Sequence, residues 1–240
     1  MRMRPSREEF HALAAEHTVV PVWTELLGDL ETPVSAYLKL VADGEGFVFE
    51  SVEHGERWSR FSFVGHDPVA TFELRNGVVT KKGQHLSPTI PYDQGMLAVL
   101  DAVLDAYRAP ILPELPPLQG GVVGYLGYDV VREVEHLPDV PHDDRRMPDA
   151  VMSIIGSLAA FDHWKQRIYL IESVPVLDMD AEGVDREYDA AIERVKASAA
   201  KLALPLATPP VEPPEAGEAP PQVRSTMADG VYQRAVEVAK

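Results

Sequence analysis

The residues best suited to bind a small molecule lie in one stretch, residues 47–65. It combines the carboxylate of Glu50, serine hydroxyls, the guanidinium of Arg60 and several aromatic rings. Glu50 or backbone carbonyls suit an ammonium group, hydroxyls or Arg60 suit a carboxylate, and apolar strand faces suit a side chain. These residue types permit a site for an amphipathic amino acid, but on residue types alone a plain pair of strands with a polar surface is the favoured interpretation.

Other patterns that often mark chemistry do not assemble a catalytic set. The glycine-rich stretch 120–128 matches neither a dinucleotide-binding nor a Walker phosphate loop, so close packing of a strand backbone against aromatics is favoured over phosphate binding. The pairs His11/His17 and His136/His142 are each six residues apart, which is not the spacing of a helical metal site. With no cysteine and no nucleophile elbow, we predict no catalytic residue and no metal ligand in this chain.

The elements that position residues 47–65 are predicted to be antiparallel strands, because apolar and polar residues alternate and Asn76-Gly77 is typical of a two-residue hairpin turn. Pro21 favours an edge position for its strand, and the nearly continuous apolar run 150–161 favours a central one. Strands are predicted over 18–23, 46–51, 60–64, 69–75, 78–81, 150–161 and 166–174.

Helices are predicted to cover these strands. Ser6 with Glu9 is a capping box, and Thr32-Pro33 is an N-cap followed by a first helical residue. One apolar face at helical spacing is formed by Leu97, Leu100, Leu104 and Tyr107. A second helix is predicted from Asp185 to Leu204, with an apolar face formed by Tyr188, Ile192, Val195, Ala199 and Leu202. We therefore predict an α+β fold in which antiparallel β-sheets form a sandwich with helices packed outside.

The composition changes abruptly after residue 204. Residues 205–224 are rich in proline and poor in large apolar residues, which is typical of a linker. Residues 225–240 predict an amphipathic helix with no terminator. We expect residues 1–204 to form one domain and 225–240 to begin a truncated second one; the alternative is a tail helix that docks back onto the first domain.

The charge balance argues against two classes of partner. The chain of 240 residues has 22 Lys plus Arg against 38 Asp plus Glu, a net charge of −16. Such a surface repels nucleic acid and anionic lipid, so neither a nucleic acid nor a membrane partner is expected. No run of about 18 apolar residues occurs, and a cytoplasmic location is expected.

Four stretches together resemble the amino-terminal part of anthranilate synthase component I. They are Thr32–Leu40; Glu50-Ser51 with Trp58–Gly65; Gly120–Arg132; and Ser225 to Tyr232. In this family chorismate and ammonia, the latter from a glutamine amidotransferase partner (component II), give anthranilate and pyruvate with Mg²⁺ as cofactor. The resemblance implies a lyase of tryptophan biosynthesis in a hetero-oligomer, with the chorismate and metal residues beyond Lys240. A fragment without that part is expected to be inactive.

The resemblance also implies a feedback site for L-tryptophan in this segment. Ser51 is the first candidate for a ligand contact, followed by Glu50, Trp58, Ser59, Arg60 and Phe61. Some family members hold the inhibitor with a nearby lysine, whereas residue 61 here is phenylalanine, which leaves the partner of the ligand carboxylate open. Component I of aminodeoxychorismate synthase, a stand-alone amino-acid-binding module and a scaffold that docks the amidotransferase are the alternatives.

Overall fold

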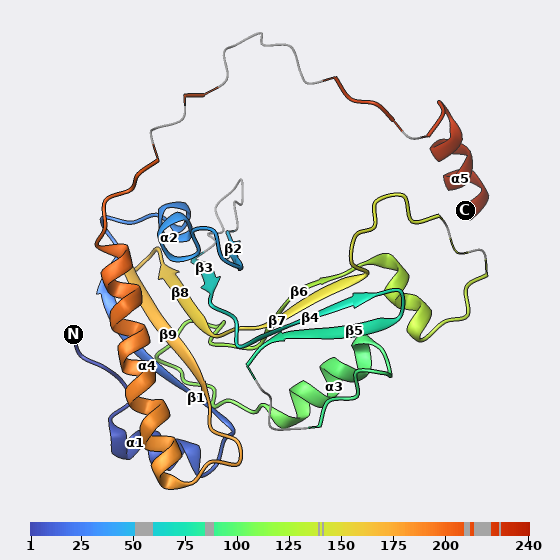
Figure 1. The fold of residues 1–240 in the computed structure, drawn as a ribbon. Helices are drawn as coiled ribbons and strands as arrows, with labels where there is room; N and C mark the ends of the chain where they lie inside the picture. The colour runs from blue at the N-terminus through green and yellow to red at the C-terminus, as the bar shows by residue number, and fades with distance from the viewer. Residues whose placement is uncertain are drawn as a thin grey trace. The chain divides into compact units, whose positions relative to one another are not determined.

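The structure is a computed structural model that describes residues 1–50, 60–84, 89–138, 140, 142–208, 212–213, 222–225 and 227–240. The chain forms two compact units, Met1–Leu206 and Ala207–Lys240. Among the described residues, the larger unit contains two antiparallel sheets with helices packed on them (Figure 1). The predicted α+β class with antiparallel sheets is confirmed.

The first sheet has the strand order β1-β9-β8-β3-β2. Its strands are β1 (Val19–Leu27), β2 (Gly46–Phe49), β3 (Phe61–His66), β8 (Ser157–Asp162) and β9 (Arg167–Pro175). The predicted edge position of the strand with Pro21 is confirmed, since β1 ends the sheet and a residue without an N–H is tolerated there. β8 and β9 lie inside the sheet, and almost all of their residues are buried.

The second sheet has the strand order β5-β4-β7-β6. Its strands are β4 (Ala70–Arg75), β5 (Val78–Gly83), β6 (Val122–Leu126) and β7 (Ala150–Ile154). Asn76 and Gly77 have φ of 49° and 75°, the left-handed conformation that a two-residue hairpin turn requires at both positions. The hairpin predicted from these two residues is confirmed.

The prediction of one strand over 150–161 is wrong, because β7 belongs to the second sheet and β8 to the first. The chain crosses between the sheets at Ile155-Gly156. A Cβ at Gly156 would lie 2.1 Å from the carbonyl oxygen of Asp67, so only glycine allows the backbones to pass this closely. Both strands are buried, and an apolar run alone therefore does not reveal that the chain changes sheets.

Three helices pack on the first sheet: α1 (Arg7–Ala14), α2 (Pro33–Leu40) and α4 (Ala181–Leu202) (Figure 1). The capping box of Ser6 and Glu9 and the N-cap Thr32 are confirmed. α4 begins before the predicted Asp185, because the side chain of Asp180 accepts a hydrogen bond from the N–H of Gly183 and caps it there. Its predicted face is confirmed: Tyr188, Val195 and Leu202 are buried, with Ile192 and Ala199 packed beside them.

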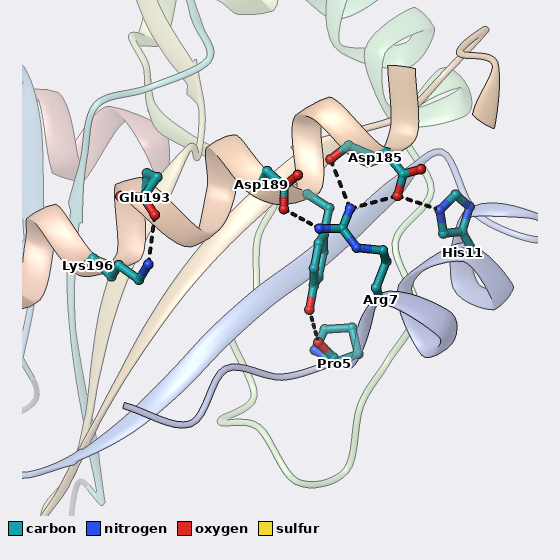
Figure 2. Close-up of polar contacts among 8 residues, drawn as sticks. Pro5, Arg7, His11, Asp185, Asp189, Glu193 and Lys196 are labelled. Carbon is teal, nitrogen blue, oxygen red and sulfur yellow. Dashed lines mark hydrogen bonds and ion pairs between the residues drawn. The ribbon is translucent and has the colours of Figure 1, made fainter. Parts of the chain in front are cut away.

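Charged side chains also attach α1 to α4 (Figure 2). Arg7 Nη1 lies 2.7 Å from Asp185 Oδ1, Arg7 Nη2 pairs with Asp189, and the guanidinium carbon is 4.9 Å from the centroid of the Tyr188 ring. His11 Nε2 lies 3.0 Å from the same Asp185 oxygen. We call Arg7, His11, Asp185, Asp189 and Tyr188 the Arg7 network.

Helix α3 (Met96–Ala106) packs on the second sheet. The face predicted to pack is partly wrong, because Leu104 is 59% exposed while Met96, Val99 and Val103 are buried. Apolar residues surround most of this helix, so its spacing permits more than one buried face. Glu133, which ends the 3₁₀ helix η1 (Tyr128–Glu133), caps α3 by accepting hydrogen bonds from the N–H groups of its first two residues.

The smaller unit contains helix α5 (Val231–Ala239). The helix predicted from Ser225 begins later, after Gly230 in the left-handed conformation with φ of 79°. None of its residues is buried. Within the part of the chain that the structure describes, no helix has the length and apolar content needed to cross a membrane.

Candidate functional site

The predicted ligand-binding stretch begins and ends on two paired strands. β2 ends at Phe49, Glu50 follows it as an exposed residue, and Arg60 directly precedes β3. The antiparallel register places Phe49 opposite Phe63, so Glu50 and Phe61 come to the same end of the strand pair. Ser51, Trp58 and Ser59 lie outside the described residues. The structure thus brings Glu50, Arg60 and Phe61 to one end of β2 and β3.

Four phenylalanines form one face of this strand pair, which we call the aromatic face: Phe47, Phe49, Phe61 and Phe63. Opposite residues of an antiparallel pair, and alternate residues of one strand, share a face. The Phe47 and Phe49 ring centroids are 4.7 Å apart, and those of Phe61 and Phe63 are 6.2 Å apart. Phe49 is 46% exposed. An apolar surface is therefore available beside the polar Glu50.

Arg60 is held by the turn between β8 and β9. Its Nε lies 3.0 Å from Asp162 Oδ1 and its Nη2 lies 2.6 Å from Asp162 Oδ2, a two-point ion pair. The guanidinium carbon is 4.7 Å from the Phe61 ring centroid and 5.1 Å from that of Trp164. We call Arg60, Phe61, Asp162 and Trp164 the Arg60 cluster.

The electrostatics of this cluster favour an ionised Asp162. Burial of Asp162 raises the pKa of its carboxyl, but the hydrogen bonds from Arg60 and from the backbone N–H groups of Lys165 and Trp164 outweigh burial, so the pKa lies below its ordinary value. The same hydrogen bond raises the pKa of Arg60. The two side chains therefore stay oppositely charged at neutral pH.

A cleft of about 410 Å³ opens beside Phe47, between the two sheets. Gly65 and His66 of β3 line it together with residues from the second sheet: Thr71, Glu73, Val123, Gly124, Tyr125, Val151 and Ser153. This volume suits a small molecule, and the mixture of aromatic, hydroxyl and carboxylate groups suits an amphipathic one. Glu50, Arg60 and Phe61 do not line the cleft; from the same stretch, Phe47 and Gly65 do.

Two buried ionisable groups near the clefts were not predicted from the sequence. His66 Nδ1 lies 2.8 Å from Asp67 Oδ2, and burial lowers the pKa of its imidazole. Glu172 lies 3.0 Å from Arg194 Nε in a neighbouring cleft of about 450 Å³, and burial raises the pKa of its carboxyl despite hydrogen bonds from Ser157 and Arg194. Both lie in apolar strands, and the sequence pattern of such a strand does not mark a single ionisable residue as part of a site.

The glycine-rich stretch forms β6, as the packing interpretation predicted. A Cβ at Gly124 would lie 1.9 Å from the carbonyl oxygen of Val151 in the paired strand β7. Glycine is needed here because the two backbones approach closely. The stretch thus has a packing role within the second sheet.

Nothing in the described ranges assembles a hydrolytic or metal-binding set. Ser62 Oγ lies 2.8 Å from His163 Nε2, but Ser62 is 4% exposed and so is not accessible to a substrate. Across the described residues, no group of three or more His, Asp or Glu side chains is placed to hold a metal ion.

Comparisons with curated proteins give a consistent set of relatives. The chain is 39% identical over 202 residues to "Anthranilate synthase component 1" of Mycolicibacterium smegmatis, covering 84% of this chain and 38% of that protein. It is 42% identical over 154 residues to the protein of the same name from Thermus thermophilus, covering 63% of this chain and 31% of that protein. It is 35% identical over 219 residues to the protein of the same name from Synechocystis, covering 88% of this chain and 41% of that protein. The chain thus spans about two fifths of the length of such relatives.

Comparison with solved structures matches anthranilate synthase component I from Streptococcus pneumoniae, at 25% identity and a TM-score of 0.42. The match covers 71% of this chain and 36% of that one. No family model matches the chain.

Proposed function

Because the matched residues belong to the anthranilate synthase component I family, we propose that the chain is the amino-terminal part of such an enzyme. The longer protein converts chorismate and ammonia, released from glutamine by an amidotransferase subunit, to anthranilate and pyruvate. The similarity to relatives of this name over most of the chain is the observation that carries the proposal. The enzyme acts in the cytoplasm, in tryptophan biosynthesis.

In this proposal the catalytic groups and Mg²⁺ belong to a continuation of the chain. The described residues do not fit Mg²⁺, which prefers carboxylate and other oxygen ligands, because they offer no cluster of three such side chains. We propose three parts for the chain. Residues 1–204 form the regulatory domain, 205–224 form the linker, and 225–240 form the first helix of the catalytic domain. The boundary between compact units at residue 206 supports this division.

We also infer that the two sheets are packed as a sandwich. Support comes from a core on the face of the first sheet opposite α4, where Trp23, Leu158 and Ile171 are buried and Val123 of the second sheet packs against them. Side chains of both sheets thus contribute to one apolar core.

We place the L-tryptophan feedback site at the end of β2 and β3, with Ser51, Glu50, Trp58, Ser59, Arg60 and Phe61 as its residues from this chain. The aromatic face beside Glu50 supports this, because an indole ring needs apolar contact close to groups that bind its ammonium and carboxylate. Inhibition requires tryptophan to bind one arrangement of the two domains better than the catalytic one. The catalytic domain therefore supplies part of the pocket.

Isolated, the chain is expected to bind L-tryptophan weakly or not at all, since half of the pocket is missing. Isothermal titration calorimetry of the 240-residue chain with L-tryptophan tests this. Micromolar affinity, which corresponds to about −8 kcal/mol, would contradict a shared pocket.

The reaction is tested by mixing the chain with chorismate, Mg²⁺ and ammonia and recording anthranilate fluorescence. We expect no signal from these residues alone and a signal when the continuation of the reading frame is restored. Formation of aminodeoxychorismate by the restored protein would contradict the proposed reaction while leaving the chorismate-using family intact.

A further inference from the structure

We propose that the outer edge of strand β6 (Val122–Leu126) pairs with the same strand of a second copy of this chain. The two strands run antiparallel about a two-fold axis at Gly124, and the second sheets of the two copies join into one continuous sheet. The inference does not depend on the proposed function. Its basis is the hydrogen bonding of β6 and the residue types of the outer strands.

One side of β6 has a row of backbone groups that point away from the sheet. In the described part of the chain, β6 is an outer strand of the second sheet and pairs only with β7 (Figure 1). At one end of this pairing the N–H of Gly127 donates to the carbonyl oxygen of Asp149 at 2.7 Å. At the other end the N–H of Ile155 donates to the carbonyl oxygen of Gly121 at 2.9 Å. Because hydrogen-bonded pairs alternate with non-bonded pairs, every second residue between these ends turns its N–H and C=O away from β7. These residues are Val122, Gly124 and Leu126.

The outward groups of β6 are accessible. None of them forms a hydrogen bond with another of the described residues. Gly124 is exposed and has no side chain that could cover the backbone, and Leu126 is 46% exposed. An open row of N–H and C=O groups is a template for pairing with another strand. The outer edge of β6 is thus available for addition of a strand.

The other outer strands carry features that discourage such pairing. In β1, Pro21 has no N–H, and the outward N–H of Trp23 donates to the carbonyl oxygen of Arg4 at 2.6 Å. In β5, Lys81 and Lys82 place charges on the strand. β2 has only four residues. Proline, lysine, short length and coverage by another segment are the usual protections of an edge strand, and β6 has none of the first two.

β6 is complementary to a copy of itself. Residues 120–127 contain no charged residue and no proline, so two copies meet at this strand without contact between like charges. With the two-fold axis at the central glycine, Val122 lies opposite Leu126 of the second copy on one face of the joined sheet. On the other face Val123 lies opposite Tyr125 of the second copy. Each pair combines a smaller with a larger apolar side chain, and the outward groups form about six hydrogen bonds between the copies.

The size and charge of the surface predict a weak dimer. Stable interfaces bury about 800 Å² on each partner, which is more than a pair of five-residue strands covers. Each copy has a net charge of −16, so repulsion opposes association in dilute buffer and is screened by salt. We expect a dissociation constant of about 10 to 100 µM at physiological ionic strength, and tighter association in about 0.5 M NaCl.

The test is sedimentation velocity of the 240-residue chain at about 1 to 300 µM, at low and at high salt. Leu126→Lys places a charge on the edge strand opposite an apolar residue of the second copy, and we expect it to raise the dissociation constant at least about tenfold. The matched control is Val78→Lys, because Val78 is 61% exposed on β5 at the opposite edge of the same sheet. This control should leave the dissociation constant unchanged.

Hydrogen exchange of the unmodified chain provides a second measurement that needs no variant. Exchange in a peptide covering residues 120–127 should slow as the protein concentration rises, since pairing protects the outward N–H groups. A chain that stays monomeric over the whole range would overturn the inference. So would a dimer that Leu126→Lys leaves intact or that Val78→Lys weakens equally. Protection of residues 120–127 that does not depend on concentration would mean that another part of the same molecule covers the edge, and would also overturn it.

Discussion

Two arginine-centred groups hold segments of this protein in place, and their surroundings differ. In the Arg7 network the carboxylates of Asp185 and Asp189 are 44% and 62% exposed, whereas in the Arg60 cluster Asp162 is 2% exposed. Exposed ion pairs are weakened by water and salt, but a buried carboxylate that loses its cation keeps its desolvation cost. The Arg60 cluster has fewer charges than the Arg7 network, but we expect it to contribute more to the stability of its segment.

The largest effect is expected from removing the buried carboxylate. Asp162→Ala deprives Arg60 and two backbone N–H groups of their acceptor, and we expect it to lower the free energy of unfolding by about 3 kcal/mol. Urea unfolding followed by circular dichroism measures this. Asp189→Ala in the Arg7 network is the control and should cost less than about 0.5 kcal/mol. Equal costs for both variants would contradict the comparison.

The buried carboxylate of Glu172 extends the comparison, because its pKa is raised whereas that of Asp162 is lowered. Burial raises the pKa of Glu172, although Ser157 and Arg194 donate to it. A carboxyl with a raised folded-state pKa stabilises the fold below its unfolded pKa of about 4.3, and this contribution is lost as the pH rises through the folded value. Glu172→Gln should therefore flatten the decline in stability above about pH 4.3, as measured by thermal unfolding across pH. A steeper decline in the variant would contradict the assignment.

The smallest effect is expected within the Arg7 network and should depend on salt. Hydrogen bonds from His11 and then Arg7 lower the pKa of Asp185, so Asp185 is charged at neutral pH. Asp185→Asn should lower the unfolding temperature slightly in dilute buffer and not at all in about 0.5 M NaCl, where charges are screened within about 4 Å. The loss of stability expected for Asp162→Ala should persist in the same salt. Loss of both effects together would show that burial does not distinguish the two groups.

Local chemistry made much of the fold predictable. Ser6 with Glu9, Thr32 and Asn76-Gly77 each specify a cap or turn through contacts within a few residues, and each prediction is confirmed. The prediction of one strand over 150–161 is wrong because the crossover at Gly156 depends on the backbone of Asp67, which is distant in the sequence. Helix α4 was predicted to start too late because Asp180 was not recognised as its cap.

Prediction of the candidate site from the sequence was likewise limited by contacts between residues that are distant in the sequence. Glu50, Arg60 and Phe61 could be selected because their residue types suit an amino acid ligand. Asp162, by contrast, lies 102 residues from Arg60 and occupies a position that the pattern indicates only as a turn. The register of β3 on β8, which pairs Phe61 with Asp162, brings them together, and that register is a property of the folded sheet.

The central claim is that the end of β2 and β3 senses L-tryptophan while the chemistry takes place elsewhere in the longer protein. Its most direct test is the half-inhibitory concentration of L-tryptophan for the complete synthase with Ser51→Ala, compared with wild type. Losing one hydroxyl contact to a charged ligand group should raise this concentration about tenfold. An identical inhibition curve for the two proteins would contradict the account.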